Sequence, residues 1–467
     1  MRMGAWLVVG LVSSSCAVHR FECEKHGGSA MLRIDSEHFS VTSDLPASDL
    51  RVEVRRLERL WDAFAVFLQH NPPPGERLRI VLSQANIAGE FVPDAAGFVT
   101  WGLNPLMLTT VIGKSSNRTW STNAHELVHV MSRHSLPNQP RWIAEGLAEY
   151  LGDAKFASEY VVKFGRWAWD DGPVEPLASL WAWDEARGNR DEEHAHYQSA
   201  WAWIHYLAGR EPVRLARLWT ALSSGVPPRD AFEAIFSRKE SDELRDKVQR
   251  YVDEGSYTGW NAQLSRDPIL SDPVGVSPWE VHLLRRDLAD ATGWGALAKA
   301  ESAKAREVAP SPEPFAVTLA VAADTLSGPR RTDVLLKVAE AQPIEPLVTL
   351  ELGLAVDASP SARLDSLQKA AAALPNSARA HLALAWLALE LNEPSALGSA
   401  ERTVALAPWS VEARLLQVQA LAQASRCPEA WAVVKAAQGL AVESASSEAP
   451  QVAAIRTKLL ESCKESP

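Results

Sequence analysis

This 467-residue sequence has few cysteines, no long apolar run and no block of basic residues. None of its four cysteines has the CxxC spacing of a cysteine-rich zinc site. No stretch reaches the roughly 18 apolar residues of a transmembrane helix, so we expect no membrane span. The 47 basic residues are outnumbered by 58 acidic ones and are not clustered, which argues against nucleic acid as a partner.

The N-terminus has the features of an export signal. Arg2 precedes a short apolar run over 5–12, and Ser13–Ser14–Ser15 lead to Cys16. This end resembles a bacterial lipoprotein cleavage site, in which the cysteine carries lipid, although Ser13 stands where the pattern usually has leucine. We expect an exported protein of the cell envelope, either a periplasmic or outer-membrane lipoprotein anchored through Cys16 or a simply secreted one.

The remaining cysteines are far apart in the sequence. Cys427 and Cys463 lie in the same helical tail and can pair in an oxidising compartment. Their spacing alone does not decide whether they do.

The pattern of apolar residues predicts an α+β domain after about residue 30. Aromatic and β-branched residues favour strands at 37–42, 77–82, 97–101 and 106–111, the last two as a hairpin. Apolar residues at spacings of three and four predict a helix over 48–70, and from Arg118 onward nearly all of the sequence is typical of helices. The expected fold class is a small antiparallel or mixed sheet followed by helices.

The last part of the sequence has an internal period. Pro360–Ser361–Ala362, Pro394–Ser395–Ala396 and Pro428–Glu429–Ala430 recur at intervals of 34 residues, with Ala-rich stretches between them. A period of 34 with small residues where helices cross resembles tetratricopeptide repeats, which stack pairs of helices and commonly bind protein partners. An irregular Ala-rich helical domain is the alternative.

The motif that carries chemistry is HELVH at 125–129. On a helix, His125 and His129 lie on one face and can reach one metal ion, and Glu126 beside them can take a proton from a water. A second helix beginning near Pro140, with Asn138 as its cap, would bring Glu145 back towards the histidines. Two histidines and a glutamate are a catalytic zinc set with one position open to water.

HELVH followed by W-x-x-E-G-x-A-x-Y at 142–150 resembles the gluzincin metallopeptidases. The sequence is most similar to the bacterial peptidase MA-like proteins, which often carry tetratricopeptide repeats. The resemblance implies Zn²⁺ as cofactor, His125, His129 and Glu145 as its ligands and Glu126 as general base. The connection between His129 and Glu145 is shorter than in the aminopeptidase N pattern.

With this resemblance the chain divides into four parts. We expect a leader and short linker over 1–30, a gluzincin-like metallopeptidase domain over 31–255, a connection over 256–290 and tetratricopeptide-like repeats over 291–467.

Several roles have rivals. Glu149 is an alternative ligand, or an acceptor for a histidine N–H, and His134 is a weaker rival. Gluzincins commonly place a tyrosine downstream of the glutamate ligand, which favours Tyr197 as the donor to the oxyanion, with His194 and His196 as substitutes.

The predicted activity is zinc-dependent hydrolysis of a peptide bond in a peptide or protein substrate. The strand at 97–101 can pair with an extended peptide, and the Gly-x-Met-Glu-Asn motif of aminopeptidases is absent, which favours an endopeptidase. The rival hypothesis is an exported tetratricopeptide-type scaffold with an inactive or structural zinc domain. Core packing is the favoured reason for three Trp-Ala-Trp triplets, at 167–169, 181–183 and 201–203.

Overall fold

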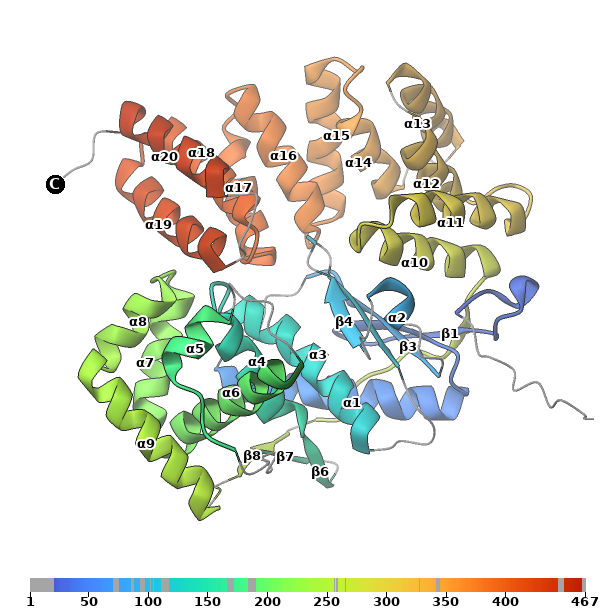
Figure 1. Cartoon of the computed structure of the whole chain (residues 1–467). Helices are drawn as coiled ribbons and strands as arrows, with labels where there is room; N and C mark the ends of the chain where they lie inside the picture. The colour runs from blue at the N-terminus through green and yellow to red at the C-terminus, as the bar shows by residue number, and fades with distance from the viewer. Residues whose placement is uncertain are drawn as a thin grey trace, which may run out of the picture.

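Figure 1 shows a computed structural model that is mostly helical, with two sheets in its N-terminal half. The structure describes residues 21–69, 75–84, 88–92, 97–100, 102–103, 105–110, 117–158, 160–165, 172–183, 190–255, 257, 259–264, 266–326, 328–341, 345–443 and 449–463. The predicted leader and Cys16 lie outside these ranges. None of the helices within them has both the length and the apolar character needed to cross a bilayer.

The larger sheet has six strands in the order β4-β5-β3-β2-β1-β9. Their bounds are β1 Leu32–Asp35, β2 Phe39–Ser43, β3 Leu78–Ser83, β4 Gly97–Thr100, β5 Leu106–Thr110 and β9 Val274–Gly275. The pairs β2–β3 and β3–β5 are parallel, and the other three are antiparallel. The predicted strands correspond to β2 to β5, and the sheet is mixed, as expected. The sequence did not predict β1 or β9.

The two faces of this sheet belong to two different cores. Ile80 of β3 packs with the helices α1 and α3, whereas its neighbour Val81 points to the opposite face. That second face is covered by α10, which contributes Val281 and Leu288. The bounds are α1 Ala47–Leu68, α3 Asn117–Ser135 and α10 Pro278–Ala291. A helix from the stretch expected to be a connection, 256–290, therefore completes the core of the sheet.

A second sheet was not predicted. It pairs β6 (Lys155–Ser158), β7 (Val161–Phe164) and β8 (Trp260–Gln263) in an antiparallel arrangement. The expectation that nearly everything after Arg118 is helical is wrong here. Each strand has four residues, too few for a clear alternation, and β8 pairs with β7 from almost 100 residues away.

Seven further helices complete this half of the molecule in the described residues. They are α2 Ala88–Phe91, α4 Arg141–Gly152, α5 Leu177–Ala182, α6 Arg190–Arg210, α7 Pro212–Ser223, α8 Pro228–Ile235 and α9 Arg238–Glu254. Helix α4 packs between α3 and α6, and its apolar face is continuous with the core formed by α1 and the sheet.

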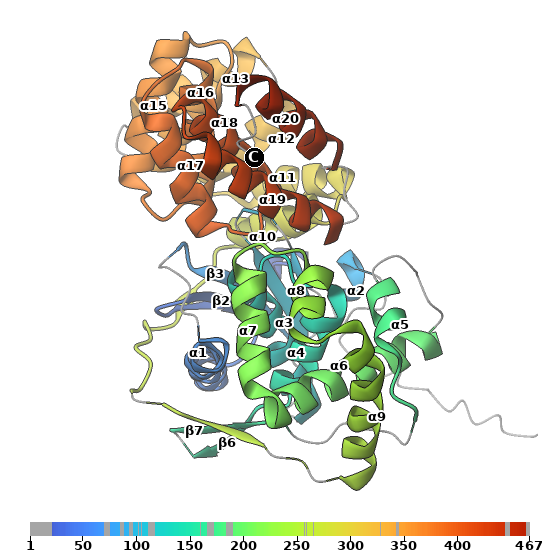
Figure 2. The same ribbon diagram turned by 90° about the vertical axis from the view of Figure 1, so that its left-hand side faces the viewer.

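The C-terminal half is a curved array of helices in Figure 1, and Figure 2 shows it from its C-terminal end. After α10 it contains α11 Gly295–Val308, α12 Phe315–Thr325, α13 Pro329–Ala341, α14 Pro346–Leu354, α15 Pro360–Ala373, α16 Ala378–Glu390, α17 Ser395–Leu406, α18 Val411–Gln423, α19 Cys427–Glu443 and α20 Ala449–Ser462. The three periodic tripeptides open α15, α17 and α19, so the expected helical repeats are confirmed as helix pairs. Cys427 and Cys463 form a disulfide that joins α19 to the end of α20.

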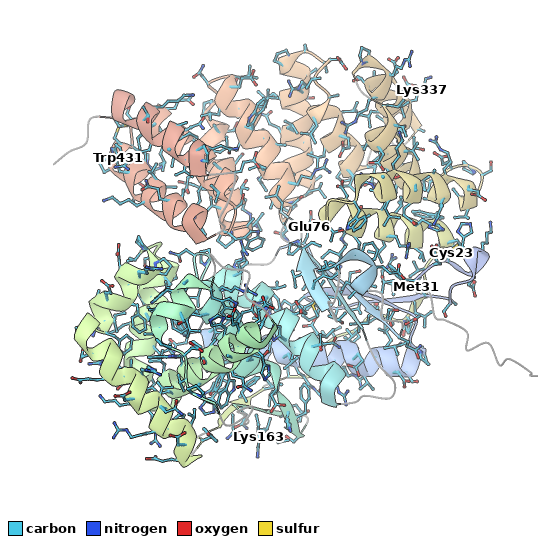
Figure 3. The ribbon with its side chains drawn as sticks, in the orientation of Figure 1. Cys23, Met31, Glu76, Lys163, Lys337 and Trp431 are labelled. Carbon is cyan, nitrogen blue, oxygen red and sulfur yellow. A yellow bond between two sulfur atoms is a disulfide. The ribbon has the colours of Figure 1, made fainter. Side chains whose placement is uncertain are left out.

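The array rests on the N-terminal half at more than one place. Trp409, between α17 and α18, is buried, donates a hydrogen bond to the carbonyl of Gly102 at 3.3 Å and lies edge-on to His134. At α19, Ala436 lies so close to Gly225 that a Cβ on this glycine would be 2.6 Å from that of Ala436. Glu76, labelled in Figure 3, lies at the boundary between the two halves.

Candidate metal centre

Helix α3 carries the HELVH motif with its two histidines towards one side and its apolar residues towards the core. Leu127, Val128 and Met131 are fully buried in the core that α1 and the sheet share. His125 and His129, spaced i and i+4, lie side by side at the edge of this core and keep 18% and 16% of their side-chain surface exposed. The packing of α3 thus fixes where the two imidazoles point.

Helix α4 brings Glu145 to the histidines. The helix begins after Pro140, as predicted, but Asn138 is not its cap. Asn138 is buried against the turn between α7 and α8, where its side-chain amide donates a hydrogen bond to the carbonyl of Val226 at 2.8 Å. Next to the glutamate, Gly146 lets α4 approach α6 so closely that a Cβ would lie 2.5 Å from the carbonyl oxygen of Ala200.

Three ligand atoms converge at this place. Nε2 of His125 lies 3.1 Å from Nε2 of His129, and Oε2 of Glu145 lies 3.4 Å and 3.3 Å from these two nitrogens. A tetrahedral zinc ion with bonds of about 2.0–2.2 Å would hold such atoms roughly 3.4 Å apart. The spacing of the three atoms therefore fits one small cation.

The burial of the Glu145 carboxylate also favours a bound cation. Its Oε2 is buried, and its polar neighbours are the Nε2 atoms of His125 and His129, at 3.4 Å and 3.3 Å. A buried carboxylate needs a positive partner, and a cation bound between this oxygen and the two imidazoles would supply one. His125, His129 and Glu145 are among the described groups whose geometry can hold a metal ion.

Glu149 and His134 occupy other positions. Oε1 of Glu149 lies 3.3 Å from Nδ1 of His125, on the side of the ring away from the three converging atoms. A carboxylate there orients the imidazole and leaves Nε2 free to coordinate, so the geometry favours Glu149 as an acceptor and not as a ligand. His134 faces Trp409 and takes no part in the cluster.

The electrostatics follow from burial and close charges. Burial opposes the charged form of His125, but the carboxylates of Glu145 and Glu149 outweigh it and raise its pKa well above its ordinary value. Burial likewise opposes ionisation of Glu145, yet His129 and His125 hold the pKa of its carboxyl well below its usual range. For Glu126 burial prevails over the two histidines and raises its pKa, which makes its carboxylate a stronger base.

Tyr197 reaches this region from α6. Burial and the negative charge of Glu145 raise the pKa of Tyr197 to about 12, so its hydroxyl keeps its proton at neutral pH. The hydroxyl interacts with Arg141, at the start of α4, and the ring lies edge-on to Trp183 with 5.0 Å between centroids. Sequence reasoning did not single out Arg141, whose place directly after Pro140 gave no chemical signal.

The substitutes for Tyr197 are placed differently. His194 is exposed and lies 3.1 Å from the side-chain amide of Gln198. The ring of His196 packs against Trp183 in a tilted arrangement, and its Nδ1 is buried without a hydrogen-bond partner among the described residues. Tyr197 is close enough to Glu145 for the charge of that carboxylate to raise the pKa of its hydroxyl.

The edge strand β4 lies directly beside the general-base candidate. A Cβ at Gly97 would be 3.2 Å from Cγ of Glu126 and 3.0 Å from the methyl group of Thr122. No described strand pairs with the outer edge of β4, since the larger sheet ends there. The backbone of this edge strand at Gly97 thus lies next to Glu126.

The tryptophans of the triplets at 181–183 and 201–203 pack in the core. Trp183, Trp201 and Trp203 are at most 1% exposed, and Trp181 packs edge-on against Trp142. This agrees with core packing and not with ligand stacking. The triplet at 167–169 lies outside the described residues.

Comparisons with known proteins add little. No family model and no curated protein matches the chain. Among solved structures, 36% of this chain is similar to 95% of a chain described as the crystal structure of MamA protein, at 19% sequence identity and a TM-score of 0.27. A likeness this loose carries no argument about fold or function.

Proposed function

We propose that this protein is a zinc-dependent endopeptidase of the cell envelope. The observation that carries the proposal is the convergence of His125 Nε2, His129 Nε2 and Glu145 Oε2 at 3.1–3.4 Å from one another, with Glu126 beside them. Two imidazoles and one carboxylate leave a fourth position for water, which is the ligand set of catalytic zinc. Zn²⁺ bound there would polarise the scissile carbonyl and make water a nucleophile at neutral pH.

The chain's own residues supply the proton transfers. Glu126 adjoins the two imidazoles in the sequence, and its raised pKa suits it to accept a proton from the attacking water. The same carboxyl can then give that proton to the departing amine. Tyr197, protonated at neutral pH, is the donor we assign to the negatively charged oxygen that develops on the carbonyl.

The position of β4 favours a peptide as substrate. An extended peptide can add to the outer edge of this strand by main-chain hydrogen bonds. Gly97 lies against Glu126, so a peptide paired there would pass close to the general base. Binding along an edge strand requires no free terminus, which agrees with an endopeptidase.

The helical array supplies a second binding surface. Its helix pairs resemble repeats that commonly bind proteins, and Trp386 of α16 is half exposed on it. We propose that α10–α20 hold a protein partner or the body of a protein substrate. Export, with or without a lipid on Cys16, remains part of the proposal.

The central test measures zinc and proteolysis in the same preparations of the full chain. Glu126→Gln is expected to keep its zinc and to lose at least about 100-fold in cleavage of a denatured protein substrate, since it removes the base but no ligand. Glu145→Gln is expected to lose both zinc and activity. Glu243→Gln, an exposed position on α9, is the matched control and should change neither.

Two outcomes would count against the proposal. Full activity in Glu126→Gln would end the catalytic account. A zinc-loaded wild type that cleaves no protein or peptide, but binds a defined partner through α10–α20 as strongly as Glu126→Gln does, would favour the scaffold.

A further inference from the structure

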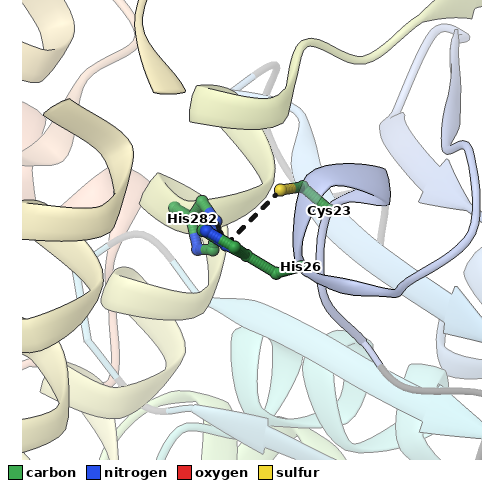
Figure 4. Close-up of side chains that lie close together, drawn as sticks. All are labelled: Cys23, His26 and His282. Carbon is green, nitrogen blue, oxygen red and sulfur yellow. Dashed lines mark hydrogen bonds between the residues drawn. The ribbon is translucent and has the colours of Figure 1, made fainter. Parts of the chain in front are cut away.

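A second group of metal-ligating side chains lies far from the first, where the first described residues meet the helical array. Cys23 directly precedes the short helix η1 (Glu24–His26), and His26 is its last residue. His282 comes from α10, 256 residues beyond His26. Figure 4 shows their three side chains pointing towards one another, and Figure 3 shows Cys23 beside the start of the array. The sequence motifs do not reveal this group, because its nearby members are a cysteine and a histidine and the third member is so distant.

The distances are those of ligands around one ion. Nδ1 of His26 lies 2.9 Å from Nε2 of His282 and 3.6 Å from Sγ of Cys23, and all three atoms lie within 4.8 Å of one another. A tetrahedral zinc ion, with bonds of about 2.3 Å to sulfur and about 2.0–2.1 Å to nitrogen, would place its ligand atoms roughly 3.3–3.6 Å apart. The distances from His26 to His282 and to Cys23 are within about 0.5 Å of that geometry, and the distance from Cys23 to His282 is at most 4.8 Å.

Glu301 fixes the direction of the His282 ring. Its Oε2 accepts a hydrogen bond from Nδ1 of His282 at 2.7 Å, and both side chains are fully buried. With the proton on Nδ1, Nε2 presents its lone pair to His26 and Cys23. A carboxylate behind the distal nitrogen is the usual support of a metal-bound histidine. Arg285 and Lys304 pair with the other oxygen of Glu301 and hold the carboxylate in place.

The backbone around η1 is shaped to present the two N-terminal residues. Gly27 has a left-handed φ of 85°, and a Cβ on Gly28 would collide with the carbonyl of Glu22. Amides of His26 and Gly28 both donate to the carbonyl of Cys23, which closes a tight turn. The turn directs Cys23 Sγ, which is 2% exposed and in no disulfide, and His26 Nδ1 to the same side.

We propose that Cys23, His26 and His282 bind a thiophilic divalent cation, with Zn²⁺ as the ion to test. One thiolate and two imidazoles suit zinc, a borderline-soft ion, better than calcium or magnesium, which prefer oxygen ligands. Glu22 lies on the other side of the His282 ring, where its buried Oε2 is 4.0 Å from Nδ1 beside Glu301, so it is not one of the proposed ligands.

The ion would act as a structural clip. The Cys23–His26 turn belongs to the same core as Val281 and Leu288 of α10, on the second face of the larger sheet. A metal bond across this junction ties the beginning of the described chain to the first helix of the array. It therefore strengthens the attachment of α10 to the sheet without touching the centre at His125.

The test separates the two centres by emptying the first. All proteins carry Cys16→Ser, so that Cys23 is the one cysteine outside the Cys427–Cys463 disulfide. In a His125→Ala/His129→Ala background we expect one zinc ion to remain per chain after dialysis. Cobalt in its place should give a thiolate-to-metal charge-transfer band. Adding Cys23→Ser or His26→Gln should abolish both signals, whereas His381→Gln, a histidine of the array outside both groups, should keep them.

A second measurement guards against misfolding. Zinc should slow the alkylation of Cys23 by a maleimide, and a chelator should restore it, in protein with unchanged far-ultraviolet circular dichroism. If the His125→Ala/His129→Ala protein binds no zinc, or Cys23→Ser keeps the ion with the same affinity, the three side chains are held by hydrogen bonds alone and the proposal fails.

Discussion

Replacing Gly146 by alanine tests whether the packing of α4 on α6 positions the metal ligand. A Cβ at this residue would lie 2.5 Å from the carbonyl oxygen of Ala200 and 2.7 Å from Cγ1 of Ile204. Comfortable contacts begin at about 3.5 Å, so α4 has to move away by about 1 Å. The backbone carbonyl of Ala200 belongs to a helix and cannot rotate aside.

The magnitude follows from two opposing effects. Overpacking of this kind costs about 1–3 kcal/mol, while alanine in place of a helical glycine returns up to about 1 kcal/mol. We expect Gly146→Ala to be less stable by about 1–2 kcal/mol. Metal ligands tolerate displacements of only about 0.2 Å, so moving Glu145 with its helix should weaken zinc binding at least about tenfold.

The assay is a zinc competition titration against a chromogenic chelator, together with thermal unfolding of the metal-free protein. Gly152→Ala is the control within the same helix, because its Cβ would meet the backbone of His125 at 3.4 Å, an ordinary contact. This variant should be as stable as the wild type or more stable by up to about 1 kcal/mol. Wild-type zinc affinity and stability in Gly146→Ala would refute the argument that close helix packing places Glu145.

Three further predictions concern separate parts of the molecule. Tyr197→Phe should keep its zinc and lower kcat by about 100-fold or more, as loss of an oxyanion donor does; an unchanged kcat would remove Tyr197 from the mechanism. Cys427→Ser opens a disulfide between residues 36 apart and should destabilise the array by up to about 4 kcal/mol, seen as a lower melting temperature that reducing agent reproduces in the wild type. For buried Glu58, burial opposes ionisation, but the hydrogen bonds from His38, at 2.6 Å and 2.9 Å, prevail and lower its pKa. A lowered pKa stabilises the fold at pH values above the ordinary glutamate range, and that stability is lost as the pH falls. Glu58→Gln should therefore be less stable than the wild type at pH 7 and approach it in acid. A pH-independent difference in unfolding free energy would contradict this.

The spacing of apolar residues predicted helices and strands correctly where an element buries one regular face. The apolar residues of α1 recur at spacings of three and four, and the helix begins only one residue before its predicted start. Strands β4 and β5 form the predicted hairpin. The pattern failed at β6, β7 and β8. Four-residue strands carry too little alternation to stand out beside Ala-rich helices, and their pairing depends on partners distant in sequence.

The role of α10 could not be read from local pattern either. Residues 256–290 contain several prolines and were expected to be a connection between domains. In the structure the prolines at the start of this stretch precede β9, and Pro278 opens a helix whose apolar side covers the second face of the sheet. Local pattern does not indicate which surface α10 covers.

By itself, the sequence determined the residue types and spacings of the first centre: two histidines one helical turn apart, a glutamate beside them, and a second acid on the next helix. Helical periodicity is local, so these relations hold wherever the helix lies. The tertiary structure decided that Glu145, and not Glu149, faces both Nε2 atoms, because Gly146 lets α4 approach α6 at that point. It also brought Cys23 and His26 to His282, since contacts across 256 residues arise from packing and leave no periodic trace in the chain.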